Sequence, residues 1–347
     1  MRTRKINAPI AVTVAGLVAV AALSTGTTPA VAGSPTGPTP AVAARDQSAT
    51  PAAVLRSRIM LHLDLARGQM PENIALSPDG TAYVTFAGAR QVAAIDRGGK
   101  IRILATLAAP ADGGVNTPAL GFALTTGIVR HRDGTVDFLY ASGDAASTGL
   151  YRLRPGGTPR RIAALPADGL PNGLAFDERR KIFFITDSVL GTISTVRQAG
   201  GPVTVWSSAP ELASTGFLGV NGIKVRDGAV WASNLDQGTL LRIPVRHGRP
   251  APVEVRAGGL TGIDDFAFTG DGTDQVIAAL VGQNTVVRVD VTGRSTTLLT
   301  AADGLQNPTS VAVQGRTVYV TSAAYLTATD PNLIVAHGVP SLSFVAS

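Results

Sequence analysis

The chain has 347 residues, of which 45% are hydrophobic and 5% aromatic, with 39 glycines, 22 prolines and no cysteine. The formal net charge is +6, but the basic residues are scattered without interleaved aromatic side chains, a pattern that argues against nucleic-acid binding. The lack of cysteine excludes disulfide bonds and a thioether-linked lipid anchor.

Residues 1–32 have the pattern of a secretory signal peptide. Basic residues at positions 2, 4 and 5 precede an apolar run from Ile10 to Leu23, and Ala30-Val31-Ala32 forms a small-x-small cleavage pattern. A single membrane anchor is the alternative, but the apolar run is shorter than the roughly 18–20 residues that span a bilayer. The pattern therefore predicts a secreted, extracellular protein with no stable membrane insertion after cleavage.

The next segment, residues 33–54, is rich in Pro, Thr and Ala and has no hydrophobic period, which predicts a disordered linker. A second small-x-small pattern at Ala41-Val42-Ala43 leaves two candidate positions for the mature N-terminus.

From residue 55 onward, one pattern recurs: a polar residue, a short apolar run, a polar turn and a second apolar run, as in LPNGLAFDERRKIFFITDS at 170–188. The spacing of 43 to 54 residues between copies is near the 40–50 residues of a four-stranded propeller blade. The six copies open at Glu72, Thr126, Asn172, Asn221, Asp264 and Thr309. The repeat predicts an all-β fold, a six-bladed β-propeller of four-stranded blades over residues 55–347.

Within the first blade, we expect strands over 73–76, 82–86, 92–96 and 101–107, from the axis outward. The segment Leu55 to Leu65 resembles the outermost strands of other copies, whereas the last copy lacks one. We therefore predict that the N-terminal strand pairs with the last blade, whose third strand lies between Asn332 and Val345. This pairing closes the ring and removes an open sheet edge.

Inner strands of a propeller converge on its axis, so the opening residues of the copies should face one another at one mouth of the channel. Two carboxylates and two amide carbonyls form a hard oxygen cage that suits one Ca²⁺ ion better than Zn²⁺ and also admits other divalent ions. The predicted metal ligands are Glu72, Asn172, Asn221 and Asp264, and the further substrate or ring candidates are Thr126, Asp265 and Thr309. The alternative for any single opener is a structural role, because strand starts commonly need polar side chains.

Four segments make the chain similar to the calcium-dependent propellers of the senescence-marker-protein/gluconolactonase/LRE-like group, related to paraoxonase and diisopropylfluorophosphatase. These segments are PENIALSPDG at 71–80, LPNGLAFD at 170–177, VNGIKV at 220–225 and GIDDFAF at 262–268. The resemblance implies that the four predicted ligands hold a catalytic calcium, and it places Asp265 where paraoxonases have a further amide ligand. Asn73 and Gly173 replace residues that bind a second calcium in paraoxonases, which argues against that second site.

If the cage holds calcium, we expect hydrolysis of a small-molecule lactone or related ester by a monomeric protein, with the ion polarising the carbonyl group. Asp264 is the candidate general base or nucleophile, while Glu72 neutralises the charge of the ion. Phe217, Leu218 and the insertion at 109–122 are candidate apolar walls for the substrate.

Histidine catalysis has little support in the sequence. His62, His131 and His247 fall at solvated or structural places, and His337 alone could approach the mouth. The competing hypothesis is a non-catalytic propeller that serves as a binding or scaffold module. A strictosidine-synthase-like condensing propeller is a weaker third class, because no acid stands at a ring position apart from the ligands.

Overall fold

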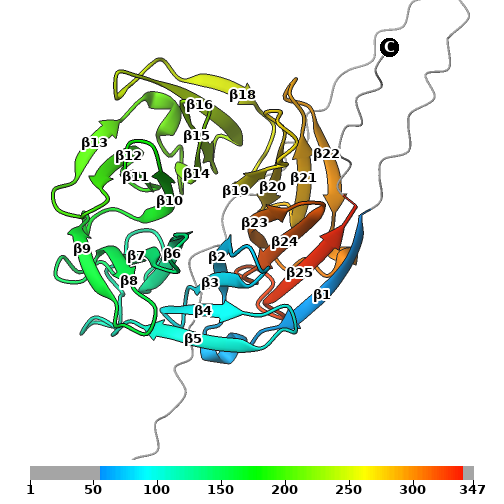
Figure 1. Ribbon diagram of the computed structural model, residues 1–347, viewed down its shortest axis with the longest axis horizontal. Coiled ribbons are helices and arrows are strands. Elements are labelled where there is room, and N and C mark those ends of the chain that lie inside the picture. Colours follow the sequence, from blue (N-terminus) through cyan, green and yellow to red (C-terminus); the bar gives the residue numbers. More distant parts are fainter. Residues whose placement is uncertain (1–54, 339–347) are drawn as a thin grey trace, which may run out of the picture.

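The computed structural model describes residues 55–338, so the predicted signal peptide (1–32), the predicted linker (33–54) and the end of the predicted propeller (339–347) lie outside the described residues. Six antiparallel sheets are arranged in a ring, as Figure 1 shows. The prediction of an all-β, six-bladed propeller is confirmed.

Each blade begins at the axis and adds strands outward in chain order. Blade 1 contains β2 (Pro71–Leu76), β3 (Ala82–Phe86), β4 (Gln91–Ile95) and β5 (Ile101–Thr106). Blade 2 contains β6 (Leu124–Arg130), β7 (Val136–Ala141), β8 (Gly149–Leu153) and β9 (Arg160–Ala164). Blade 3 contains β10 (Pro171–Asp177), β11 (Ile182–Asp187), β12 (Thr192–Arg197) and β13 (Thr204–Ser207).

The second half of the ring follows the same order with one addition. Blade 4 contains β14 (Val220–Arg226), β15 (Ala229–Asn234), β16 (Thr239–Arg246) and β18 (Glu254–Ala257), with the two-residue strand β17 (Arg249–Pro250) as a fifth. Blade 5 contains β19 (Ile263–Phe268), β20 (Val276–Leu280), β21 (Thr285–Val289) and β22 (Ser295–Leu299). Blade 6 contains β23 (Pro308–Gln314), β24 (Thr317–Ser322), β25 (Asn332–His337) and β1 (Arg56–His62).

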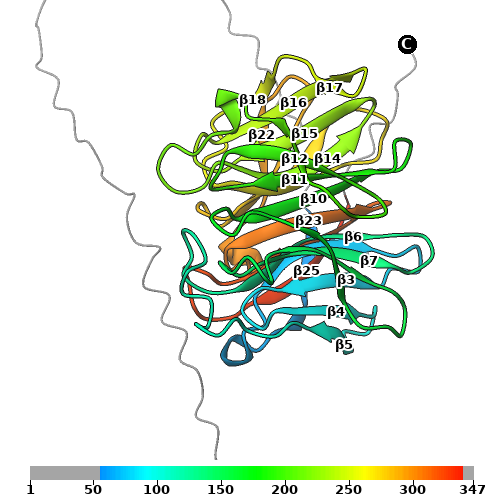
Figure 2. The ribbon, with the colours of Figure 1, turned by 90° about the vertical axis from the view of Figure 1, so that its left-hand side faces the viewer.

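Helical structure within residues 55–338 is limited to three short 3₁₀ turns: η1 (Leu65–Arg67), η2 (Pro210–Leu212) and η3 (Ala301–Asp303). No helix in this part of the chain has the length and apolar character needed to cross a membrane. The side view in Figure 2 shows the inner strands β10 and β23 in the middle of the molecule.

The ring closes through the first and last strands of the described chain. β1 pairs antiparallel with β25, from Arg56 opposite His337 to His62 opposite Asn332. Figure 1 shows this contact between the blue and red ends of the ribbon. The N-terminal strand is therefore the outer strand of blade 6, as predicted, and it covers an edge that would otherwise expose unpaired backbone groups.

The core is divided among the contacts between neighbouring blades. Six apolar clusters each combine side chains from two adjacent blades, and together they account for all six blade-to-blade contacts. Trp231, 1% exposed, packs between blades 4 and 5. Full burial of a Val, Leu or Ile side chain contributes about 1.5–3 kcal/mol, so these clusters are the main force that holds the blades together.

Candidate metal centre

The structure brings the four predicted metal ligands together at one mouth of the ring. Glu72, Asn172, Asn221 and Asp264 all line one cavity with a volume of about 60 Å³. They come from the starts of β2, β10, β14 and β19, in blades 1, 3, 4 and 5. Side chains that are far apart in the sequence therefore meet on the axis, as the repeat predicted.

A local irregularity at the start of each inner strand directs these residues toward the axis. The pairing of the first and second strands shifts register in all six blades at the opening residue, for example between Pro71 and Asn73 and between Ile263 and Phe266. A bulge leaves one residue outside the regular ladder and turns its side chain away from the pleat. This explains how Glu72 and Asp264 face the cavity, whereas Asn73 and Asp265, which directly follow them, do not line it and contact each other across the ring at 3.3 Å.

Hydroxyl groups on second strands join the bulges of neighbouring blades. Thr85 Oγ1 accepts a hydrogen bond from the Asn73 amide at 3.1 Å and donates to the Thr126 carbonyl at 2.7 Å. Ser233 Oγ accepts from the Gly222 amide at 2.8 Å and donates to the Asp264 carbonyl at 2.5 Å. Thr186 makes the same bridge between the Gly173 amide and the Asn221 carbonyl. These bridges fix the backbone from which the candidate ligands project.

Thr126 and Thr309 occupy ring positions, but their side chains are used between blades. The hydroxyl of Thr126 donates to the Pro171 carbonyl at 2.8 Å, and that of Thr309 donates to the Pro71 carbonyl at 2.7 Å. Both residues are buried, and neither lines the cavity. They hold in place the residues that directly precede Asn172 and Glu72.

The cavity concentrates negative charge in a buried place. Burial raises the pKa of Glu72 to about 7; the hydrogen bond from Tyr325 opposes this increase and the charge of Asp265 adds to it. Burial also raises the pKa of Asp264 well above its usual value, helped by the charges of Glu72 and Asp265 and opposed by Asn221 and Lys224. Among the described residues that line the cavity there is no Lys, Arg or His. The donor set therefore fits a hard divalent cation.

Tyr325 belongs to this cavity and was not predicted from the sequence. It lies in the loop between β24 and β25, and its hydroxyl donates a hydrogen bond to Glu72 Oε2 at 2.5 Å. Burial raises the pKa of this phenol well above its usual value, so it is neutral at physiological pH. Leu235 and Val281 also line the cavity from loops that follow a second strand. Those loop positions were the signal that could have identified Tyr325.

Asp265 lies beside Asp264 in sequence but makes a different set of contacts. Its carboxylate accepts hydrogen bonds from Lys224 Nζ at 2.6 Å, Ser310 Oγ at 2.7 Å and Asn73 Nδ2 at 3.3 Å, and the residue is 2% exposed. These partners come from blades 4, 6 and 1, so one side chain joins four blades. Asp265 does not line the cavity.

The residues 55–338 contain no group of three or more His, Cys, Asp or Glu side chains arranged as a metal site. The candidate centre has two carboxylates, and the amides of Asn172 and Asn221 supply its remaining protein oxygens. A site of this composition favours an oxygen-preferring ion over a transition metal.

The apolar walls lie where the sequence predicted them. Phe217, Leu218 and the residues Ala119, Leu120 and Phe122 of the insertion line the cavity. The prediction that His337 could approach the mouth is wrong. β25 runs from Asn332, opposite Ser322, to His337, opposite Thr317, and so ends on the other face.

The other histidines lie away from the cavity. His62 is exposed on β1 and His247 is exposed in the turn between β16 and β17. His131 is buried, and its Nε2 lies 2.6 Å from Asp137 Oδ2.

No family model matches the sequence, and no curated protein matches it. Solved structures do match. Regucalcin from Agrobacterium tumefaciens, a calcium-binding protein, is 17% identical with a TM-score of 0.60, covering 83% of this chain and 96% of its own. A gluconolactonase from Xanthomonas campestris is 14% identical with a TM-score of 0.60, covering 82% of this chain and 89% of its own.

A different enzyme shares the same architecture. A catalytically inactive virginiamycin B lyase from Staphylococcus aureus with quinupristin is 13% identical with a TM-score of 0.56, covering 82% of this chain and 100% of its own. At such identities the likeness shows the fold. The resemblance to gluconolactonase-like propellers is thus confirmed at the level of the fold.

Proposed function

We propose that this protein is a secreted, calcium-dependent hydrolase of a small lactone or related ester. The observation that supports it most is the convergence of two buried carboxylates and two amides, with no basic side chain among the described residues of an apolar-walled cavity. Calcium prefers such oxygen ligands, and an ion bound there would polarise an ester carbonyl as a Lewis acid.

Each side chain of the centre has a role that follows from its contacts. Glu72 and Asp264 supply two negative charges, and Asn172 and Asn221 supply neutral oxygens, so positions remain for water and substrate. The hydrogen bond from Tyr325 fixes the orientation of Glu72, which makes Glu72 a charge-neutralising ligand. The hydroxyl of Tyr325 donates its hydrogen bond to Glu72 and not to Asp264. We therefore assign to Asp264 the role of accepting a proton from water or attacking the carbonyl carbon.

The apolar walls determine how a substrate enters. A cavity of about 60 Å³ holds an ion with a few waters and has no room for a lactone as well. Leu120, Phe122 and Phe217 are half-buried members of the apolar cluster at the mouth. We expect these side chains to move aside for the substrate and then to exclude water from the bound ester.

The comparisons support the same class without determining the substrate. One matching structure is a gluconolactonase and another is a calcium-binding regucalcin, whereas a third is a lyase. The charge and ligand types of the cavity favour the calcium-dependent hydrolase among these activities.

The test combines metal binding with turnover. Calcium titration by calorimetry, together with a panel of lactones and aryl esters, is applied to the wild type, to Asp264→Asn and to Asp227→Asn. Asp227 lies in the exposed turn between β14 and β15, away from the cavity. Asp227→Asn is therefore a control that makes the same Asp-to-Asn change outside the site. We expect turnover that needs calcium, is lost in Asp264→Asn with the fold retained, and is unchanged in Asp227→Asn. Stoichiometric calcium binding without turnover on any substrate, or no calcium binding, would contradict the proposal and favour a non-catalytic binding module.

A further inference from the structure

A second, larger cavity of about 560 Å³ lies between blades 2 and 3, away from the metal centre. Its walls come from the turn between β6 and β7, the end of β8, the turn between β10 and β11, and the loop after β12. The metal cavity is instead built at the starts of the inner strands and in the loops that follow second strands. The two cavities therefore open on opposite faces of the ring.

The floor of this cavity is a buried ion-pair network. Asp137 is fully buried and accepts two hydrogen bonds from Arg152, at 2.8 Å from Nε and 2.9 Å from Nη2, while His131 Nε2 lies 2.6 Å away. The ring of His131 packs edge-on against Phe176, with the ring centroids 4.8 Å apart. This fixed geometry holds Arg152 at the cavity wall with part of its guanidinium unused, because a guanidinium has five N–H donors.

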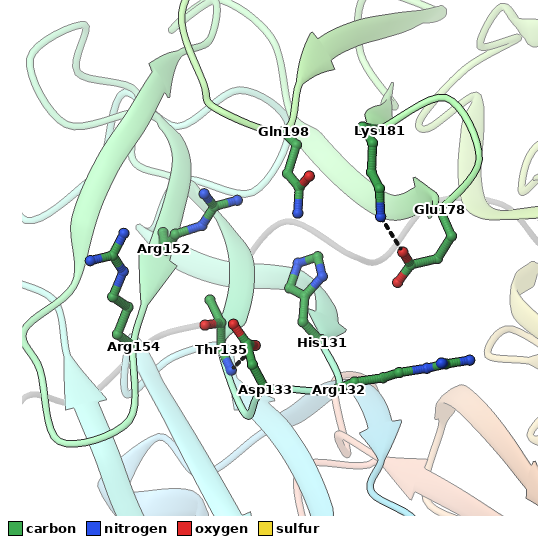
Figure 3. A pocket seen from close by; sticks show the side chains of 9 residues that line it. All are labelled: His131, Arg132, Asp133, Thr135, Arg152, Arg154, Glu178, Lys181 and Gln198. Atoms are coloured by element: carbon green, nitrogen blue, oxygen red, sulfur yellow. Dashed lines mark hydrogen bonds and ion pairs between the residues drawn. The ribbon is translucent and has the colours of Figure 1, made fainter.

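Other polar groups surround the same space. Figure 3 shows Arg152 and Arg154 along one side, Lys181 and Glu178 on the other, and Gln198 and His131 between them. Within residues 55–338 Arg154 makes no ion pair. Lys181 pairs with Glu178, but both side chains are exposed, Lys181 by 57% and Glu178 by 62%. Exposed pairs are weak, so the ammonium group is available to a stronger partner.

The carboxylates at this cavity do not balance its basic groups. Asp133 is engaged in its own turn, where it accepts a hydrogen bond from the Thr135 amide at 2.9 Å. Asp137 is already neutralised by Arg152. The hollow is lined by four basic side chains, Arg132, Arg152, Arg154 and Lys181, against the carboxylates of Asp133 and Glu178 and the buried Asp137 behind Arg152, which leaves one positive charge in excess.

The geometry points to a binding site for a small polar molecule that carries a phosphate or sulfate group. Cationic groups that approach from several directions suit a tetrahedral oxoanion, whereas a planar carboxylate is satisfied by a single guanidinium. The volume lies within the roughly 300–1,000 Å³ of small-molecule sites. No aromatic side chain other than His131 is among the described residues of the wall, so a sugar-like body fits better than a stacked base.

The test is calorimetric titration at low ionic strength with four probes: glucose 6-phosphate, glucose 6-sulfate, inorganic phosphate and glucose. We expect at least one ester to bind more tightly than inorganic phosphate, and we expect glucose not to bind. Added salt should lower the affinity for the ester. The better of the two esters shows which oxoanion the site takes.

Three variants distinguish a specific site from general attraction to a basic protein. Arg154→Gln should lower the affinity for the ester about tenfold, because it removes one charge-assisted contact. Glu178→Gln should strengthen binding, because it frees Lys181. Arg249→Gln, an exposed position on β17, is the matched control and should change nothing.

Both informative positions, Arg154 and Glu178, are exposed, so the variants should fold normally, which circular dichroism can check. Binding of neither ester, equal binding of glucose, or equal weakening by Arg154→Gln and Arg249→Gln would overturn the proposal. None of these measurements depends on hydrolysis at the opposite face.

Discussion

The contact between Lys224 and Asp265 offers a sharp test of how the ring is held together at its axis. The two groups lie 2.6 Å apart, but they are buried unequally: the side chain of Asp265 is 2% exposed and that of Lys224 is 29% exposed. Removing one partner leaves the other charge behind, and the cost depends on how well water can reach the charge that remains.

The burial difference predicts which substitution costs more. In Lys224→Met, the carboxylate of Asp265 remains buried with two neutral donors, Ser310 and Asn73, and we expect a loss of about 3–5 kcal/mol in the free energy of unfolding. Methionine loses the cation–π contact that Lys224 Nζ makes 5.4 Å from the centroid of the Phe266 ring, but its thioether can pack against the same ring, so we expect packing to be largely preserved. In Asp265→Asn, the ammonium of Lys224 can turn toward water, and we expect a smaller loss, about 1–3 kcal/mol.

The double variant completes the argument. With both charges removed, the loss should be close to that of Asp265→Asn alone, so the two single effects should not add. Urea unfolding followed by circular dichroism measures all four proteins at one pH. Lys181→Met, which removes an ion pair exposed on both sides, is the control and should change stability by no more than about 0.5 kcal/mol. Additive effects, or a larger loss in Asp265→Asn than in Lys224→Met, would refute the reasoning.

Three other predictions follow from the site and the closure of the ring. Tyr325→Phe removes the hydrogen bond that favours the ionised form of Glu72, so calcium should bind several-fold more weakly in calorimetry, while Tyr319→Phe should leave binding unchanged. Because the folded pKa of Glu72 is raised from 4.5 to about 7, its contribution to the stability of the calcium-free protein is lost as pH rises. Urea unfolding in a chelator should therefore give about 2 kcal/mol less stability at pH 8 than at pH 5.5, and a larger stabilisation by calcium at pH 8; a flat profile would contradict this. Deletion of residues 1–62 removes β1 and should cause aggregation in size-exclusion chromatography, whereas deletion of residues 1–54 keeps every described strand and should not; equal behaviour would disprove the role of the closing strand.

The sequence was sufficient for the parts of the molecule that repeat. Alternating apolar runs at a near-constant spacing predict the blades, and the register of the copies selects Glu72, Asn172, Asn221 and Asp264, which the structure brings to one cavity. Register works here because each inner strand begins with the same bulge, so equivalent positions in the repeat are equivalent in space.

The sequence could not show what each opening residue does with its side chain. Thr126 and Thr309 share the register of the ligands, yet their hydroxyls reach backbone carbonyls of the next blade, a contact that depends on the distance between blades. Tyr325 lies in the loop after the second strand of blade 6, which is longer than the equivalent loops of the other blades, so the repeat could indicate the loop but not the residue within it. The basic cavity between blades 2 and 3 combines turns of two copies, and nothing in either copy alone indicates a hollow.

The pairing of β1 with β25 has a consequence for how the molecule is made. Within residues 55–338, β1 has a single strand partner, β25, so β1 must wait until β25 has been synthesised. Until then five blades can assemble in order from the ribosome or the export channel, but the sixth is incomplete and its neighbours keep an uncovered apolar face. The final step of folding is therefore the late pairing of β1 with β25, and if the protein is secreted as we propose, this step takes place after β25 has crossed the membrane.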